Sequence, residues 1–248
     1  MNDSLQVVCF SGGKDSTALV LRMAELGERF VQLFNVTGDE LPNLITHIAK
    51  VVALTKSPLH CTNPGFSLQE KIRDYKSLPN QNMRWCTRQL KIEPTKAWLI
   101  DKPNAVLCVG LRADEADRGA ATLYGESVTY RCPFQEWGWK LADVTAYLQA
   151  KGISVPERTD CALCYDQRIS EWYRLWKNYP DRYAAGEALE ELTGHTFRSV
   201  TLDTWPASLR EMRLEFERGR LPRDVISMPL FGDDYTVKDR NRCRVCSF

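Results

Sequence analysis

A short polar segment near the amino end carries the residues best suited to hold phosphate. Residues 11–16 read Ser-Gly-Gly-Lys-Asp-Ser and lie between an apolar run and a segment with helical spacing. Glycines permit a tight turn that brings several backbone N–H groups to one anion, and the helix dipole favours the same anion. This segment, called the phosphate loop below, predicts phosphate contacts from Ser11, Gly12, Gly13, Lys14, Asp15 and Ser16.

The pattern of the loop differs from the Walker motif, which needs four residues between its first glycine and Gly-Lys-Ser or Gly-Lys-Thr. SGGKDS resembles instead the signature of the PP-loop family, the ATP pyrophosphatases. The resemblance implies an adenine nucleotide, ATP with Mg²⁺, cleaved between its α and β phosphates while a substrate is adenylated. It implies catalytic roles for Lys14, Asp15 and Arg112. The plainer alternative is a Ser-Gly-Gly turn with a helix cap at Asp15.

Three downstream segments extend the resemblance to the phosphoadenosine phosphosulfate (PAPS) reductase-like members of the superfamily. TGDELP at 37–42 resembles their acidic turn beside the nucleotide, VGLRADEADRG at 109–119 their Gly-x-Arg-x-x-Glu stretch, and MRWCTRQLKIEP at 83–94 their basic segment. Arg84, Arg88 and Lys91 of the basic segment could hold phosphate or sulfate. The alternatives are a helix N-cap at Asp39 and a solvated basic face. The resemblance covers roughly the first two thirds of the chain and implies nucleotide contacts from Thr37, Asp39, Arg88, Gly110, Arg112 and Arg118.

The cysteines form two CxxC pairs, Cys161 with Cys164 and Cys243 with Cys246. Two such pairs can close a tetrahedral thiolate site for Zn²⁺ or an iron-sulfur cluster of the 4Fe-4S type. The resemblance to cluster-bearing adenylylsulfate reductases offers Cys86 with Cys161, Cys164 and one tail cysteine as the competing ligand set. A third hypothesis makes the terminal pair a redox or persulfide-carrying tail.

Aromatic and basic residues interleave between residues 168 and 183. Such interleaving can stack bases and hold backbone phosphates, but the three-and-four spacing favours a helix that packs its aromatic stripe inward. The three histidines are scattered along the chain, and none is assigned a catalytic role.

The elements that must position these residues alternate between strands and helices. Apolar runs at 5–10, 30–36 and 105–109 predict strands, and helical spacing follows the first two runs. Such alternation predicts a parallel sheet, with Ser11, Thr37 and Gly110 at neighbouring carboxyl ends. We therefore expect an α/β, Rossmann-like PP-loop domain over residues 1–140 and a helical, cysteine-bearing lobe over residues 141–248, with helices at 141–152, 169–180 and 208–220.

The bulk composition excludes a global electrostatic attraction to nucleic acid or membrane, because 33 basic residues face 32 acidic ones. No apolar run approaches the length of a membrane span, and the amino end lacks a secretory pattern, so we expect a cytoplasmic protein. The partner hypotheses are a nucleic acid or a sulfur-donor protein, together with a homodimer.

Three functions compete. The first is an ATP-dependent adenylating enzyme acting in sulfur transfer, of the nucleic-acid thiolation or phosphorothioation type, which the complete loop favours. The second is a phosphoadenylylsulfate or adenylylsulfate reductase, an oxidoreductase, which the basic segment and Cys86 favour. Such reductases usually have a degraded loop and a Glu-Cys-Gly-Leu-His-like tail, whereas this chain ends in RCRVCSF. The third is a nucleotide-binding subunit without turnover.

Overall fold

The computed structural model describes residues 4–115, 124, 128–199 and 203–226. These residues form two compact units. The first, called the sheet unit, comprises the described residues within 4–67 and 86–161; the second, called the helical unit, comprises those within 68–85 and 162–226. The α/β class predicted from the sequence is confirmed, whereas the boundary predicted at residue 140 stays a prediction.

The sheet unit is built on five strands that all run parallel, in the order β3-β2-β1-β4-β5. In this register Cys9 pairs with Leu33, and the N–H of Phe10 donates to the carbonyl of Leu33. The chain leaving β1 at the phosphate loop therefore starts beside the end of β2. The strands are β1 Gln6–Cys9, β2 Phe30–Asn35, β3 Leu59–Thr62, β4 Val106–Cys108 and β5 Thr129–Arg131.

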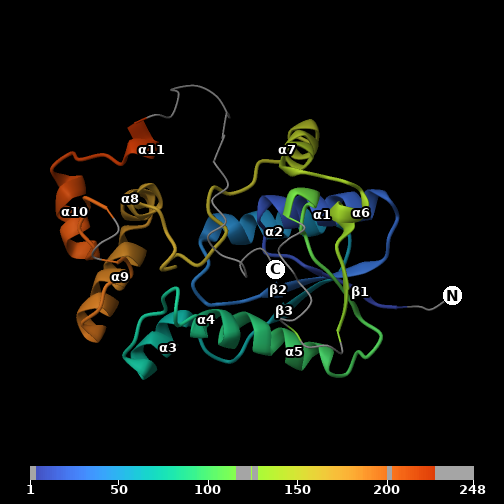
Figure 1. Ribbon diagram of the computed structural model, residues 1–248, viewed down its shortest axis with the longest axis horizontal. Coiled ribbons are helices and arrows are strands. Elements are labelled where there is room, and N and C mark those ends of the chain that lie inside the picture. Colours follow the sequence, from blue (N-terminus) through green and yellow to red (C-terminus); the bar gives the residue numbers. More distant parts are fainter. Residues whose placement is uncertain (1–3, 116–123, 125–127, 200–202, 227–248) are drawn as a thin grey trace. The chain divides into compact units, whose positions relative to one another are not determined.

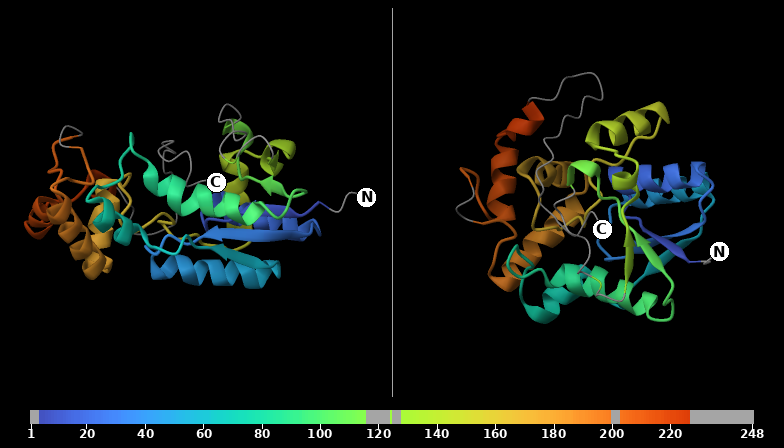
Figure 2. Two further views of the ribbon diagram at one scale, coloured as in Figure 1. Left: turned by 90° about the horizontal axis from the view of Figure 1, so that it is seen from below. Right: turned by 45° about the vertical axis from the view of Figure 1, so that its right-hand side comes forward.

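Helices cover both faces of this sheet, as Figures 1 and 2 show. Side chains alternate along β1, so Val8 packs under the helices of one face and Val7 under the helix of the other. The first face carries α1 Lys14–Glu25, α2 Pro42–Thr55, α6 Pro133–Glu136 and α7 Leu141–Ala150. The second carries α5 Glu93–Leu99, which continues a helical run through α4 Trp85–Thr87 and the π-helix η1 Arg88–Ile92. A 3₁₀ turn, η2, spans Ala113–Glu115.

The helical unit has its own core around the fully buried side chains of Trp172 and Tyr183. The partly exposed rings of Tyr173 and Trp176 pack on Phe216, so the aromatic stripe faces inward, as its spacing favoured. The helices are α3 Leu68–Tyr75, α8 Ile169–Asn178, α9 Pro180–Thr193, α10 Leu209–Glu217 and α11 Arg223–Ile226. Across the residues described, none of the helices has the length and apolar character that a membrane span requires.

Candidate nucleotide site

The phosphate loop joins β1 to α1 and depends on a left-handed backbone at Gly12, where φ is 77°. A Cβ at this position would lie 2.5 Å from Leu44 Cδ1 on α2, so the turn needs glycine for its conformation and for its close packing. Helix α1 begins after Gly13, and no side chain caps its first turn. The two loop hydroxyls, Ser11 Oγ and Ser16 Oγ, lie 3.2 Å apart. The amino end of α1 thus presents backbone donors and hydroxyls suited to an anion.

A buried hydrogen bond ties the start of α1 to α2. Thr17 Oγ1 lies 3.0 Å from Nε2 of His47, and both side chains are buried. Burial lowers the pKa of His47, and the charge of Lys50 lowers it further. The imidazole is therefore held neutral and acts as a polar anchor behind the loop.

Arg112 organises the loop from the carboxyl end of β4. Its side chain is only 4% exposed, and its Nη1 donates to both carboxylate oxygens of Asp15 at 3.0 Å. The same guanidinium pairs with Asp114 and Glu115. A guanidinium held by three carboxylates orients Asp15 in the first turn of α1, so the geometry gives Arg112 a positioning role. Its predicted contact with the nucleotide stays a prediction.

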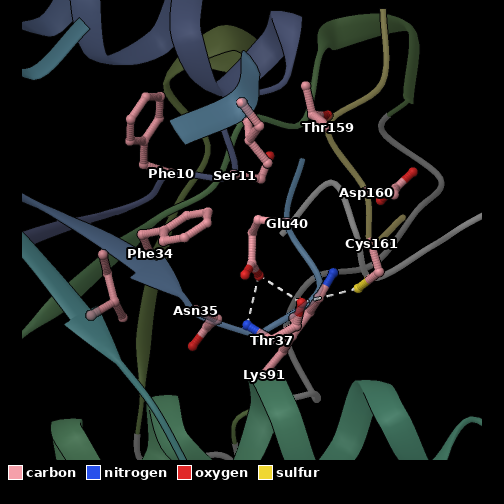
Figure 3. Close-up of a pocket in the computed structure, with 12 residues that line it drawn as sticks. Phe10, Ser11, Phe34, Asn35, Thr37, Glu40, Lys91, Thr159, Asp160 and Cys161 are labelled. Carbon is pink, nitrogen blue, oxygen red and sulfur yellow. Dashed lines mark hydrogen bonds between the residues drawn. The ribbon is translucent and has the colours of Figure 1, made fainter. Parts of the chain in front are cut away.

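A pocket that is partly open to solvent lies where β1 and β2 end. Figure 3 shows Thr37 and Glu40 after β2, Lys91 of the π-helix η1 and Cys161 lying close together at this pocket. Apolar side chains from the end of β1, from β2 and from α2 complete its wall. The lining residues are Phe10, Ser11, Leu33, Phe34, Asn35, Thr37, Glu40, Leu44, Lys91, Thr159, Asp160 and Cys161.

A chain of hydrogen bonds crosses this pocket from Cys161 to Glu40. The Cys161 thiol donates to Thr37 Oγ1 at 3.3 Å, and the Thr37 hydroxyl donates to Glu40 Oε1 at 2.6 Å. The backbone N–H of Thr37 donates to the same oxygen at 2.6 Å. Burial raises the pKa of the Cys161 thiol to about 12, and the charge of Lys91 opposes that rise. The thiol is therefore neutral and anchored at neutral pH.

The basic segment contributes its cation through the π-helix. The N–H of Glu93 bonds to the carbonyl of Arg88, five residues back, and Pro94, the next residue, has no N–H to donate. Lys91 of this turn lines the pocket, while the Arg88 side chain is 76% exposed and pairs with Glu93 at 3.1 Å. The nucleotide contact of Arg88 stays a prediction, and Lys91 is the residue of the basic segment that reaches the pocket wall.

The other site residues predicted from the sequence fall into three groups. Thr37 and Asp39 are buried at the end of β2, where Thr37 lines the pocket. Gly110 packs against the loop, since a Cβ there would lie 3.6 Å from the carbonyl carbon of Asp15. Arg118, Cys243 and Cys246 lie outside the described residues.

The described residues by themselves do not supply a complete set of sulfur ligands for a metal ion. Cys161 and Cys86 both belong to the sheet unit and lie near enough for the charge of Cys86 to raise the pKa of Cys161. Cys164 belongs to the helical unit. Within the described ranges no group of three or more His, Cys, Asp or Glu side chains could hold a metal ion. A tetrahedral thiolate site would need the tail cysteines, and both ligand sets stay predictions.

Asn35 and Glu40 are pocket residues that sequence reasoning missed. Asn35 is the last residue of β2, and Glu40 lies within the acidic turn without having been singled out. Only the position of Asn35 at the carboxyl end of a predicted strand could have marked it, because ligands bind there in parallel sheets.

Comparison with known proteins agrees with this geometry. The family model described as the phosphoadenosine phosphosulfate reductase domain matches residues 6–160, which include β1, the loop, the basic segment and the segment reaching the pocket. No curated protein matches the chain.

Similar solved structures include three different enzymes. The phosphoadenylyl-sulfate reductase of Candida auris, in a phosphate complex, has 18% identity and a TM-score of 0.49, covering 61% of this chain and 75% of that one. The U34-tRNA thiolase NcsA of Methanococcus maripaludis, with its 4Fe-4S cluster, has 12% identity and a TM-score of 0.49, covering 78% and 72%. The NMN synthetase of Francisella tularensis has 15% identity and a TM-score of 0.43, covering 92% and 90%.

All three TM-scores lie below 0.5, so the assignment depends on the family match and on the loop itself. That match spans more than half of the chain. With its phosphate loop at the end of the first strand of a parallel sheet, this chain belongs to the phosphoadenosine phosphosulfate reductase domain family, within the PP-loop fold.

Proposed function

We propose that this chain binds ATP at the phosphate loop, adenylates an acceptor with release of pyrophosphate, and acts in sulfur transfer. The observation that carries the proposal is the complete loop, which leads directly into a pocket that Ser11 and Lys91 both line. A loop that offers several donors can bind several phosphate oxygens at once, and the β,γ-pyrophosphate of ATP supplies them.

The proposed reaction begins with attack of an acceptor oxygen on the α phosphorus of ATP. The new phosphorus–oxygen bond forms as the bond between the α phosphorus and the oxygen bridging to the β phosphate breaks. The phosphate loop binds the departing pyrophosphate. Lys14, the loop N–H groups and the serine hydroxyls stabilise its negative charge. Mg²⁺ carried by the triphosphate would neutralise part of that charge. A hydrosulfide equivalent from a sulfur-donor partner then displaces AMP, so that sulfur replaces oxygen without net oxidation or reduction.

We propose a cysteine-held metal, a 4Fe-4S cluster or Zn²⁺, as the further cofactor. The CxxC quartet Cys161, Cys164, Cys243 and Cys246 is one ligand set, and Cys86 is the alternative ligand. The soft thiolate donors favour these metals over Mg²⁺. A homodimer and a nucleic-acid or sulfur-donor protein partner remain proposals of the same kind.

The second candidate is a sulfonucleotide reductase, which the family match favours. Product analysis separates the two reactions. Anaerobically purified protein is incubated with ATP, Mg²⁺, sulfide and total RNA or DNA as acceptor, and separately with phosphoadenylyl sulfate and a dithiol. Pyrophosphate and AMP from the first mixture support adenylation. Sulfite from the second, with no pyrophosphate from the first, assigns the reductase. Binding of ATP without either product points to a non-catalytic subunit.

A further inference from the structure

The amide of Asn35 has a fixed orientation at the pocket wall. Its Oδ1 accepts hydrogen bonds from Thr62 Oγ1 on β3 at 2.5 Å and from Thr95 Oγ1 on α5 at 3.0 Å. Both threonines are buried. An amide whose oxygen receives two hydroxyl protons keeps its NH₂ group for another partner. Within the described part of the chain that NH₂ group makes no hydrogen bond, and Asn35 lines the pocket.

The carboxylate of Glu40 is fixed in a complementary way. Its Oε1 accepts both the backbone N–H and the hydroxyl of Thr37. Those two bonds leave Oε2 as an acceptor, without a hydrogen-bond donor among the described residues. Glu40 and Asn35 line the same pocket, which Figure 3 shows together with the ring of Phe34. The pocket wall thus carries one donor, on Asn35, and one acceptor, on Glu40, each of fixed polarity.

We propose that Asn35 and Glu40 select the edge of an amino-substituted nucleobase. In adenine and cytosine a ring nitrogen that accepts lies beside an exocyclic amino group that donates. The ring nitrogen would accept from Asn35 Nδ2, and the amino group would donate to Glu40 Oε2. Hypoxanthine, guanine and uracil present a carbonyl oxygen and a ring N–H at that edge, so their polarity is reversed and they are rejected.

This inference depends on the proposed function in one respect, namely that the pocket takes nucleotides. The base has two sources, the adenine of ATP or an adenine or cytosine of the acceptor. Because the recognition chemistry is the same for both, the test uses one substitution and two sets of probes.

The substitution is Asn35→Asp. It keeps an oxygen for Thr62 and Thr95 but turns the pocket-facing donor into an acceptor. Equilibrium binding of ATP and ITP is measured, since ITP carries hypoxanthine. If the base is that of ATP, the wild type prefers ATP, and Asn35→Asp lowers ATP affinity by about tenfold to a hundredfold while ITP binding is retained or improved. Asn104→Asp, at an exposed site on the amino side of β4, is the matched control and leaves the preference unchanged.

The second set of probes covers the acceptor. Binding of cytidine, adenosine, uridine and inosine is measured with the protein saturated by α,β-methylene ATP. If the preference for cytidine or adenosine is lost in Asn35→Asp while the ratio of ATP to ITP affinity is unchanged, the base belongs to the acceptor and the inference is supported. If Asn35→Asp lowers the affinity for all probes equally, or changes the affinity for none of them, the inference is overturned.

Two further variants keep the test decisive. Should Asn35→Asp not fold, the double variant Thr62→Val, Thr95→Val frees the amide to rotate, and the base preference is expected to fall towards unity. Lys14→Ala separates this inference from the proposed function. If Lys14→Ala weakens ATP binding while the base preference is intact, both proposals are supported. If a base preference is found but Lys14→Ala leaves ATP binding unchanged, only the ATP-binding role of the loop is refuted. If Lys14→Ala weakens ATP binding but no base preference is found, only base selection is refuted.

Discussion

At the scale of single residues, the site depends on side chains that are held by other side chains. Arg112 places Asp15, Thr37 places Glu40, and two threonines place Asn35. The loop signature and Thr37 could be found from the sequence, because local residue types at a strand end define them. The strand end could have marked Asn35, but the orientation of its amide could not be predicted, because its partners Thr62 and Thr95 are 27 and 60 residues away.

The ion-pair cluster of Arg112 yields a stability prediction. Arg112→Gln removes a guanidinium that is 4% exposed and that pairs with the carboxylates of Asp15 and Glu115. Breaking a buried pair from one side costs about 3–5 kcal/mol, so the free energy of unfolding should fall by about that amount. Urea unfolding at pH 7 measures it. Arg88→Gln, at an exposed pair, is the control and should change stability by less than about 1 kcal/mol. Equal effects of the two substitutions would contradict the positioning role.

At the scale of elements, the first three strands predicted from the sequence are present as β1, β2 and β4. Strands β3 and β5 were not predicted. They lie at the two edges of the sheet, and most of their residues are exposed or half-buried, so neither sequence shows an apolar run like those of β1, β2 and β4. The π-helix was not predicted either, because Pro94 alone does not indicate a π-turn before it. Lys91 of this turn lines the pocket, whereas the Arg88 side chain is exposed.

The turn after β2 provides a matched test of backbone geometry. Gly38 has φ of 73°, and a Cβ there would lie 2.5 Å from Ser67 Cβ. Gly38→Ala should therefore combine left-handed strain with a steric clash, lowering the free energy of unfolding by about 2–4 kcal/mol and displacing Glu40. Gly27 has φ of 72°, and a Cβ there would meet no atom within 4 Å, so Gly27→Ala should cost only about 1 kcal/mol. Thermal unfolding of both variants measures the difference, and equal losses would refute it.

Glu190 predicts a pH dependence in the helical unit. It accepts the N–H groups of Phe197 and Leu209, and burial raises its pKa to about 7. The folded state therefore retains a proton that the unfolded state releases, so stability should fall as pH rises from about 4.5 to about 7. The loss attributable to this group is at most about 3 kcal/mol. Urea unfolding at several pH values should show a weaker decline in Glu190→Gln than in the wild type. Parallel profiles would contradict the prediction.

At the scale of the whole molecule, the α/β class and the PP-loop family could be predicted from sequence pattern and motif. The composition of the helical unit could not. Residues 68–85 group with residues beyond 161, and no feature of composition marks that association. Such long-range grouping follows from packing between surfaces that a local pattern does not describe.

The two cysteine ligand sets predict different effects of single substitutions on the metal content of the whole protein. If the two CxxC pairs hold the metal, Cys161→Ser and Cys243→Ser should both lose it, whereas Cys86→Ser should retain it. If Cys86 is a ligand, Cys86→Ser should lose the metal as well. Iron and zinc analysis of anaerobically purified protein, with a visible spectrum, measures the outcome. Full retention of metal in Cys161→Ser would refute both ligand sets.

The proposed function requires that the phosphate loop bind the β and γ phosphates of ATP. Calorimetric titration of ATP and of AMP into the wild type and into Lys14→Ala measures this contribution. ATP is expected to bind the wild type at least about tenfold more tightly than AMP, and Lys14→Ala is expected to remove most of this difference while AMP binding and folding persist. Equal affinities for ATP and AMP in the wild type, or an unchanged difference in Lys14→Ala, would contradict it.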